Sequence, residues 1–92
     1  MSIDSSARLI TLPGLPAPVV AGTAFVAAGA ILVGQVTLDD HSSVWYNSVL
    51  RAEAAPITIG AGSNLQDNVS CHAHRDLPVI VGDGGIRNTG TL

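Results

Sequence analysis

Aliphatic residues recur at every sixth position through the middle of the chain. Neither the 3.6-residue period of an α-helix nor the two-residue alternation of a half-buried strand produces such a series. A chain that turns a corner every six residues does, and three such faces form one triangular coil of about 18 residues. The period therefore predicts an all-β fold, a parallel β-helix of stacked coils. The unbroken series is Val20, Val26, Leu32, Leu38, Val44 and Leu50.

A small or compact residue follows each of these aliphatic residues by four positions and is expected near a corner of the coil. An interior this narrow has no room for aromatic rings, and the chain is only 3% aromatic. We therefore expect Phe25, Trp45 and Tyr46, which are off the inward position, to lie outside the core. The hexad form resembles the left-handed kind of β-helix, an exception to the usual right-handed crossover. The corner residues are Ala24, Ala30, Val36, Ser42, Ser48 and Ala54.

Two interruptions break the register, and in solenoid proteins insertions usually mark the functional face. Nine residues rather than six separate Leu50 from Ile59, which predicts a small bulging loop of three extra residues. The hexads resume with Ile59, Leu65 and Cys71, and the segment HAHRDLP (72–78) then delays the next one until about Val81.

The repeat divides the chain into three parts. Residues 1–19 lack the period and, with LPGLPAP, indicate an extended lead-in, and residues 20–86 form the β-helix. The ending RNTGTL (87–92) places Arg87 where an aliphatic residue belongs. We therefore expect the β-helix to be incomplete at its C-terminal end.

Charge and length limit the classes of function. A net charge of −3 with only four basic residues gives no patch for phosphates, so nucleic acid is not an expected partner. Residues 9–38 carry no charge, but prolines and glycines interrupt this stretch, so we expect neither a membrane span nor a signal peptide. The lone Cys71 is consistent with a reducing, cytoplasmic location. A 92-residue chain has a small core, which favours oligomerisation.

Two of the three histidines, His72 and His74, lie one residue apart and project to the same side if the segment is extended. Such a pair can serve a zinc ion, but a catalytic zinc requires three protein ligands. His41 occupies a different place in its hexad and is not expected beside them. Two surface histidines in a loop are the commoner outcome for such a pair. Cys71 occupies the inward position and is expected in the core.

A second group of polar residues follows the inward positions of two successive coils. Arg51 follows Leu50, and the pair Gln66–Asp67 follows Leu65, so the two groups are expected near each other. An ion pair between Arg51 and Asp67 would be charge-assisted. The alternative is a surface salt bridge worth only about 0–1 kcal/mol.

Two motifs resemble those of the γ-class carbonic anhydrases and their near relatives in the hexapeptide-repeat superfamily. SSVWYNSVLRAE (42–53) is similar to the family's SSVW-N-VLRGD, and SNLQDNVSCH (63–72) is similar to its TNIQD-x-x-x-x-H. The resemblance covers roughly residues 20–86 and implies a left-handed β-helix that assembles as a homotrimer. It also implies lyase activity, in which a metal-bound hydroxide reversibly hydrates CO2 to bicarbonate.

The resemblance further implies a zinc or iron ion at each subunit interface, held by three histidines, two from one subunit and one from its neighbour. His72 matches the first ligand. Gln66 matches a residue that hydrogen-bonds the metal-bound water, and Asn64 belongs to the same motif. The residues that match the bracing of the interface are Arg51, Asp67 and Glu53, the last in place of the usual Asp.

The chain departs from the family at the other two ligands, which lie in a G-H-N-x-x-x-H segment. The counterpart of the second ligand falls at about Thr89, that of the third lies past Leu92, and RNTGTL contains no histidine. The acid that some members use as a proton shuttle falls on Ala54. We therefore interpret the chain as a truncated or frameshifted copy with one of three ligands, and expect little or no hydratase activity from it.

Two other functions fit a hexapeptide repeat. A hexapeptide acyltransferase would bind an acyl-coenzyme A between coils and use a histidine as general base. A non-catalytic trimeric scaffold would use the solenoid faces as docking surfaces, for which exposed Trp45 and Tyr46 are suitable.

Overall fold

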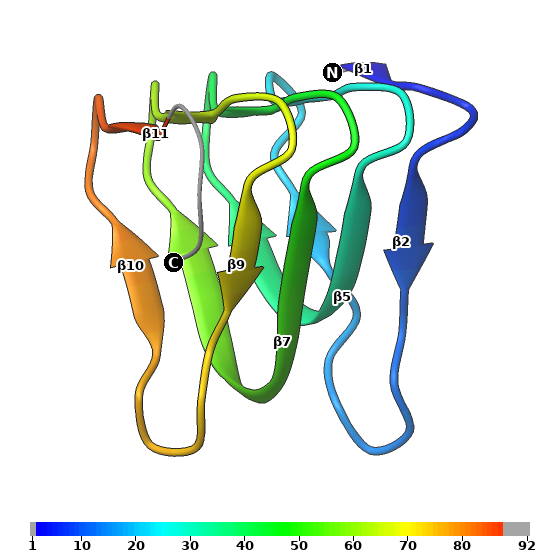
Figure 1. The fold of residues 1–92 in the computed structure, drawn as a ribbon, viewed down its shortest axis with the longest axis vertical. Helices are drawn as coiled ribbons and strands as arrows, with labels where there is room; N and C mark the ends of the chain where they lie inside the picture. The colour runs from blue at the N-terminus through cyan, green and yellow to red at the C-terminus, as the bar shows by residue number, and fades with distance from the viewer. Residues whose placement is uncertain (1, 88–92) are drawn as a thin grey trace.

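Short strands follow one another around a triangular coil in the computed structural model, which describes residues 2–87 (Figure 1). The parallel strands form about four coils of a left-handed β-helix, which confirms the predicted fold class. The strands are β1 Ser2–Ile3, β2 Arg8–Ile10, β3 Val19–Val20, β4 Phe25–Val26, β5 Ile31–Leu38, β6 Ser43–Val44, β7 Val49–Ile59, β8 Asn64–Leu65, β9 Ser70–His72, β10 Val79–Val81 and β11 Ile86–Arg87.

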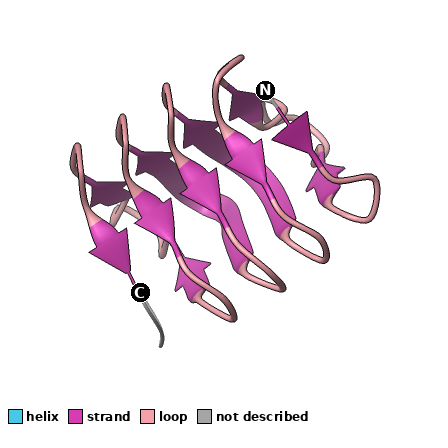
Figure 2. Cartoon of the chain, turned by 90° about the horizontal axis from the view of Figure 1, so that it is seen from above, coloured by secondary structure: helices cyan, strands magenta, loops and turns pink. Residues whose placement is uncertain are grey.

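Three faces run along the axis of the β-helix. Face 1 contains β1, β4, β6, β8 and β11 in that order. β5 and β7 are long enough to bend around a corner, so each contributes to two faces. In face 2, the first half of β5 pairs with β2 and the first half of β7 pairs with β9. In face 3, the second half of β5 pairs with β3 and the second half of β7 pairs with β10. Successive coils therefore stack strand on strand (Figure 2).

The aliphatic hexad residues stack on one another along the axis and form the core. In face 2, for example, Leu32 pairs in register with Leu50, and Leu50 with Cys71. Val20 is half-buried, whereas the rest of the series is almost fully buried, so the predicted inward positions are confirmed. The buried members are Val26, Leu32, Leu38, Val44, Leu50, Ile59, Leu65, Cys71 and Val81.

Two buried corner serines connect one coil to the next. The Ser48 hydroxyl donates to the carbonyl of Gln66 at 2.6 Å and accepts from the amide of Val69 at 3.0 Å. The Ser63 hydroxyl donates to the carbonyl of Gly82 and accepts from the amide of Gly85. Serine therefore suits these corners because its small side chain fits the space and satisfies backbone groups that the turn leaves unpaired.

The first interruption is confirmed in length but differs from the prediction in conformation. Gly34 pairs with Ala52 and Val36 with Ile57, so β7 has three more residues than β5 at this bend. The strand continues through the insertion instead of leaving it as a loop. The prediction that Ala54 is a corner residue is wrong: it is exposed because the extra residues bulge outward, and Ile57 takes the buried place beside Val36.

The two ends of the chain take part in the same sheets. Within the expected lead-in, Arg8–Ile10 pair with β5 and Ser2–Ile3 pair with β4, so these residues contribute to a first coil. At the other end, the backbone of Arg87 pairs in register with that of Leu65. Arg87 therefore occupies a hexad position where an aliphatic residue is expected. Thr89 and the rest of 88–92 lie outside the described residues.

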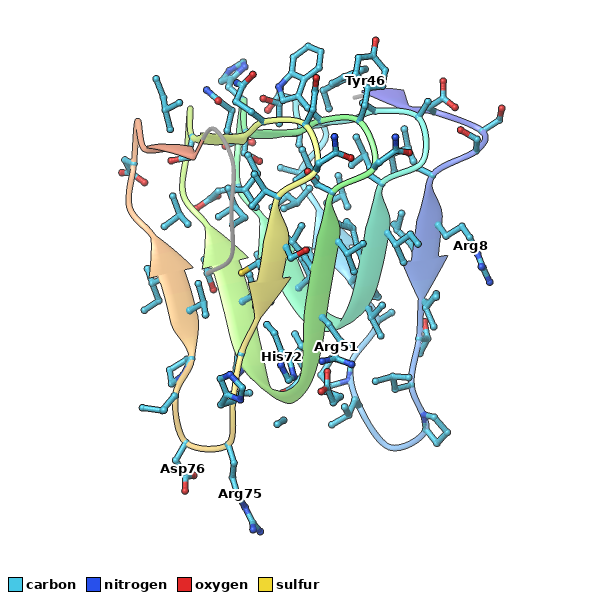
Figure 3. All side chains as sticks on the ribbon, in the orientation of Figure 1. Arg8, Tyr46, Arg51, His72, Arg75 and Asp76 are labelled. Carbon is cyan, nitrogen blue, oxygen red and sulfur yellow. The ribbon has the colours of Figure 1, made fainter. Side chains whose placement is uncertain are left out.

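The three aromatic residues lie outside the core, as predicted. The rings of Phe25 and Trp45 are in contact on face 1, with their centroids 5.0 Å apart. The centroids of the Trp45 and Tyr46 rings are 5.9 Å apart. Tyr46 is 49% exposed at the upper edge of the β-helix (Figure 3). Across residues 2–87 we find no helix with the length and apolar character needed to cross a membrane.

Candidate functional site

Two predicted site residues of the first motif, Arg51 and Glu53, meet His72 of the second motif on face 2, where β7 lies beside β9. The parallel register places Arg51 opposite His72 and Val49 opposite Ser70. These residues, together with Cys71, line a shallow hollow of about 280 Å³. Figure 3 shows Arg51 and His72 side by side, towards the end of the strands opposite Tyr46.

Both nitrogens of the His72 imidazole are in hydrogen-bond contact with side chains of β7. Nδ1 lies 3.2 Å from Nη2 of Arg51, and Nε2 lies 2.5 Å from Oε1 of Glu53. Glu53 also pairs with Arg51, with 3.7 Å between Oε2 and Nε. The three side chains therefore form a closed triangle of contacts, all within one chain.

The charge of Glu53 is favoured by this arrangement. Desolvation raises the pKa of its carboxyl group, but four other effects outweigh desolvation. These are a hydrogen bond to its own backbone, the hydrogen bond from His72, the charge of His72 when its ring is protonated and the charge of Arg51. Together they lower the pKa below its ordinary value of 4.5, so Glu53 is ionised at neutral pH and is a strong acceptor for an imidazole N–H.

The sequence motif assigned Glu53 to the bracing of the subunit interface and did not predict its contact with His72. The contact arises because Arg51 and His72 are in register and the glutamate, two residues further along β7, projects from the same side of the strand. The expected partner of Arg51 was Asp67. Within residues 2–87, however, the ion pair of Arg51 is with Glu53, while Asp67 lies exposed in the turn between β8 and β9.

His74 lies next to His72 on the same side of the chain, as its spacing predicted. The two ring centroids are 4.6 Å apart. Past His74, a tight turn closed by a hydrogen bond from the Leu77 amide to the His74 carbonyl carries Arg75 and Asp76 to the tip of the loop between β9 and β10 (Figure 3). His41 lies at another corner, in the turn between β5 and β6, where its backbone amide donates to Thr23.

The two amide residues of the second motif form a separate pair on face 1. Nε2 of Gln66 donates to Oδ1 of Asn64 at 2.5 Å. This hydrogen bond fixes the orientation of the Gln66 amide and leaves its Oε1 as an acceptor for another group. Asn64 therefore positions Gln66, a role that the sequence motif alone did not specify.

Cys71 is one of the residues that line the hollow, and its exposed fraction of 1% confirms that it belongs to the core. Burial raises the pKa of its thiol from 9.0 to about 11. Because folding raises this pKa, the stabilisation from the neutral thiol is complete below pH 9.0 and is lost as the pH rises towards about 11.

The buried thiol predicts slow alkylation. At a pH of about 8, where an exposed thiol reacts readily, iodoacetamide should modify native Cys71 far more slowly than the urea-unfolded chain, because the native thiol is both covered and protonated. Mass spectrometry of timed samples measures both rates. Equal rates would show that the thiol is accessible and would contradict its burial.

The donor set on these faces does not fit a three-histidine metal site. Within the part of the chain that the structure describes, no three His, Cys, Asp or Glu side chains gather closely enough to hold an ion. His72 is available as one ligand, but Arg51 and Glu53 already contact its two nitrogens.

Known proteins share this sequence pattern. A Methanocaldococcus jannaschii protein, provisionally named a carbonic anhydrase, is 48% identical over 58 residues, which are 63% of this chain and 36% of that protein. The mitochondrial γ-carbonic anhydrase 3 of Arabidopsis thaliana is 44% identical over 66 residues, covering 65% of this chain and 26% of that protein. The chain is γ-carbonic-anhydrase-like. It spans about a quarter to a little over a third of the length of these relatives.

A solved structure extends the comparison to the fold. A Bacillus cereus protein with a provisional acetyltransferase name superposes on the γ-carbonic-anhydrase-like chain with a TM-score of 0.82 and 32% identity. The superposition covers 86% of this chain and 45% of the B. cereus protein. No protein-family model matches the γ-carbonic-anhydrase-like chain.

Proposed function

We propose that the chain supplies one histidine and its supporting residues to a γ-carbonic-anhydrase-type site for the reversible hydration of CO2. The observation that carries this proposal is the placement of His72 beside Arg51 and Glu53 at the edge of one hollow. In the proposed site His72 would be one ligand to zinc or iron, and such an ion would supply a more acidic bound water as the source of a nucleophile.

The other residues of the proposed site act through hydrogen bonds and charge. Gln66, oriented by Asn64, offers its side-chain carbonyl oxygen as an acceptor for a water molecule. Asp67 is exposed, so it is free to meet Arg51 of another copy of the chain, although within one chain Arg51 pairs with Glu53. This proposed bracing extends the site across a subunit interface.

The proposed assembly is a homotrimer that packs through face 2. The outward side chains of this face include a group of aliphatic residues, Ile31, Val33 and Val49, that are only half-buried next to Arg51 and His72. Packing this strip against another copy would remove apolar surface from water. We place the protein in the cytoplasm, a reducing compartment that suits a free, buried Cys71 thiol.

We further propose that the 92 residues by themselves hydrate CO2 little or not at all. His72 supplies one protein ligand, and a catalytic zinc requires three. Stopped-flow measurement of CO2 hydration by the zinc-equilibrated chain, in parallel with His72→Ala, is the test. We expect both proteins to match the buffer rate. Rapid hydration by the unmodified chain that is lost in His72→Ala would contradict the proposal.

An acyltransferase is a second candidate because the Bacillus cereus structure carries an acetyltransferase name. A hexapeptide acyltransferase would hold an acyl-coenzyme A between coils. Saturable binding of coenzyme A, measured by isothermal titration calorimetry, would favour this function over the first. The Arg51, Glu53 and His72 contacts have no evident role in it.

A further inference from the structure

The partners of the His72 ring determine which nitrogen carries the proton. A guanidinium group can only donate, so Nδ1, 3.2 Å from Nη2 of Arg51, must present its lone pair. The proton of the neutral ring is then on Nε2, where the Glu53 carboxylate accepts it at 2.5 Å. The two contacts require the same tautomer, so each supports the other.

We propose that Glu53 is a positioning residue that closes His72 to external cations in this chain. It fixes the Nε2–H tautomer directly. It also helps to hold Arg51, through the pair at 3.7 Å, against the only nitrogen with a lone pair. This inference rests on the proposed role of His72 as a metal ligand, and it adds an internal competitor for that ligand.

Charge and geometry explain the closure. A metal ion at Nδ1 must displace a guanidinium of like charge, and one at Nε2 must displace both a proton and a carboxylate. The three side chains are 27–56% exposed, so the triangle is at the surface and water weakens each contact. The closure is therefore reversible, and removal of one partner should open it.

Glutamate has the length that this contact requires. Its carboxylate reaches across from β7 to Nε2 of His72 on β9. Aspartate at position 53 is one methylene shorter and would retain the charge while withdrawing the acceptor from the ring. Glutamine would retain the length and an acceptor oxygen while removing the charge.

The first test is the tautomer of His72, read from imidazole ¹⁵N chemical shifts at a pH of about 8. We expect a single Nε2–H form in the unmodified chain, its retention in Glu53→Gln, and a mixture in Glu53→Asp and Glu53→Ala. Asp39→Ala, which removes a carboxylate from the exposed turn before β6, should leave the tautomer unchanged. A mixed tautomer in the unmodified chain, or no change in Glu53→Ala, would overturn the inference.

The second test is a zinc titration followed on the same His72 resonances. We expect half-saturation at a roughly two- to fivefold lower zinc concentration in Glu53→Ala than in the unmodified chain, the range expected for loss of an exposed ion pair. Equal or weaker binding in Glu53→Ala would mean that Glu53 does not compete with the metal. Neither result depends on CO2 hydration, so failure of this inference is distinct from failure of the proposed function.

Discussion

Leu50→Ala is expected to lower the free energy of unfolding by about 2–5 kcal/mol. Leu50 is fully buried and stacks in register between Leu32 of the coil before it and Cys71 of the coil after it. Truncation leaves a cavity that two neighbouring coils share, and backbone hydrogen bonds between parallel strands prevent the coils from closing it. Urea unfolding followed by circular dichroism measures the change.

Leu77→Ala is the matched control for this prediction. Leu77 is 65% exposed in the loop between β9 and β10, so the same truncation should change the free energy of unfolding by no more than about 0.5 kcal/mol. If the two variants lose equal stability, the stacked hexad residues do not form the main core.

Gly34→Ala is expected to destabilise the fold by about 1–3 kcal/mol or more. Gly34 has a φ of 76° at the bend of β5, a conformation that residues with a Cβ rarely adopt. A Cβ added there would lie 2.7 Å from the carbonyl oxygen of Ala52 in the next coil, closer than backbone atoms can tolerate. The coils must therefore separate or the bend must change.

Gly22→Ala separates this strain from a general effect of replacing glycine. A Cβ added at Gly22 would meet no atom within 4 Å, and its φ is not positive. We expect this variant to be as stable as the unmodified chain or slightly more stable, because alanine restricts the unfolded state. Thermal unfolding of both variants under one condition makes the comparison. If Gly34→Ala and Gly22→Ala unfold at the same temperature, the tight approach of β5 to β7 is excluded.

The period of six predicted most of the fold because it reports directly on burial. Each aliphatic residue of the series points inward for the same geometrical reason, so one count along the chain located the core and the outward aromatic rings. Ala54 shows the limit of this counting. The extra residues after Leu50 change which positions face inward, and sequence spacing alone does not say where a bulge absorbs them.

The candidate site was less predictable than the core. The motifs selected Arg51, Gln66 and His72, but the partners of each side chain depend on which strand lies beside which. Arg51 was expected to pair with Asp67. Within one chain the register of β7 with β9 gives Arg51 contacts with Glu53 and His72, and its pairing with Asp67 of another copy stays a prediction. The link from Gln66 to Asn64 likewise follows from two outward positions on one strand end, which a motif does not describe.

We propose that this γ-carbonic-anhydrase-like chain holds one closed metal ligand and not a working site. The test is the amount of zinc retained per folded chain, measured after equilibration with zinc and removal of the free ion. We predict far less than one zinc per chain. A stoichiometry near one zinc per chain that His72→Ala abolishes, together with rapid CO2 hydration, would contradict the claim.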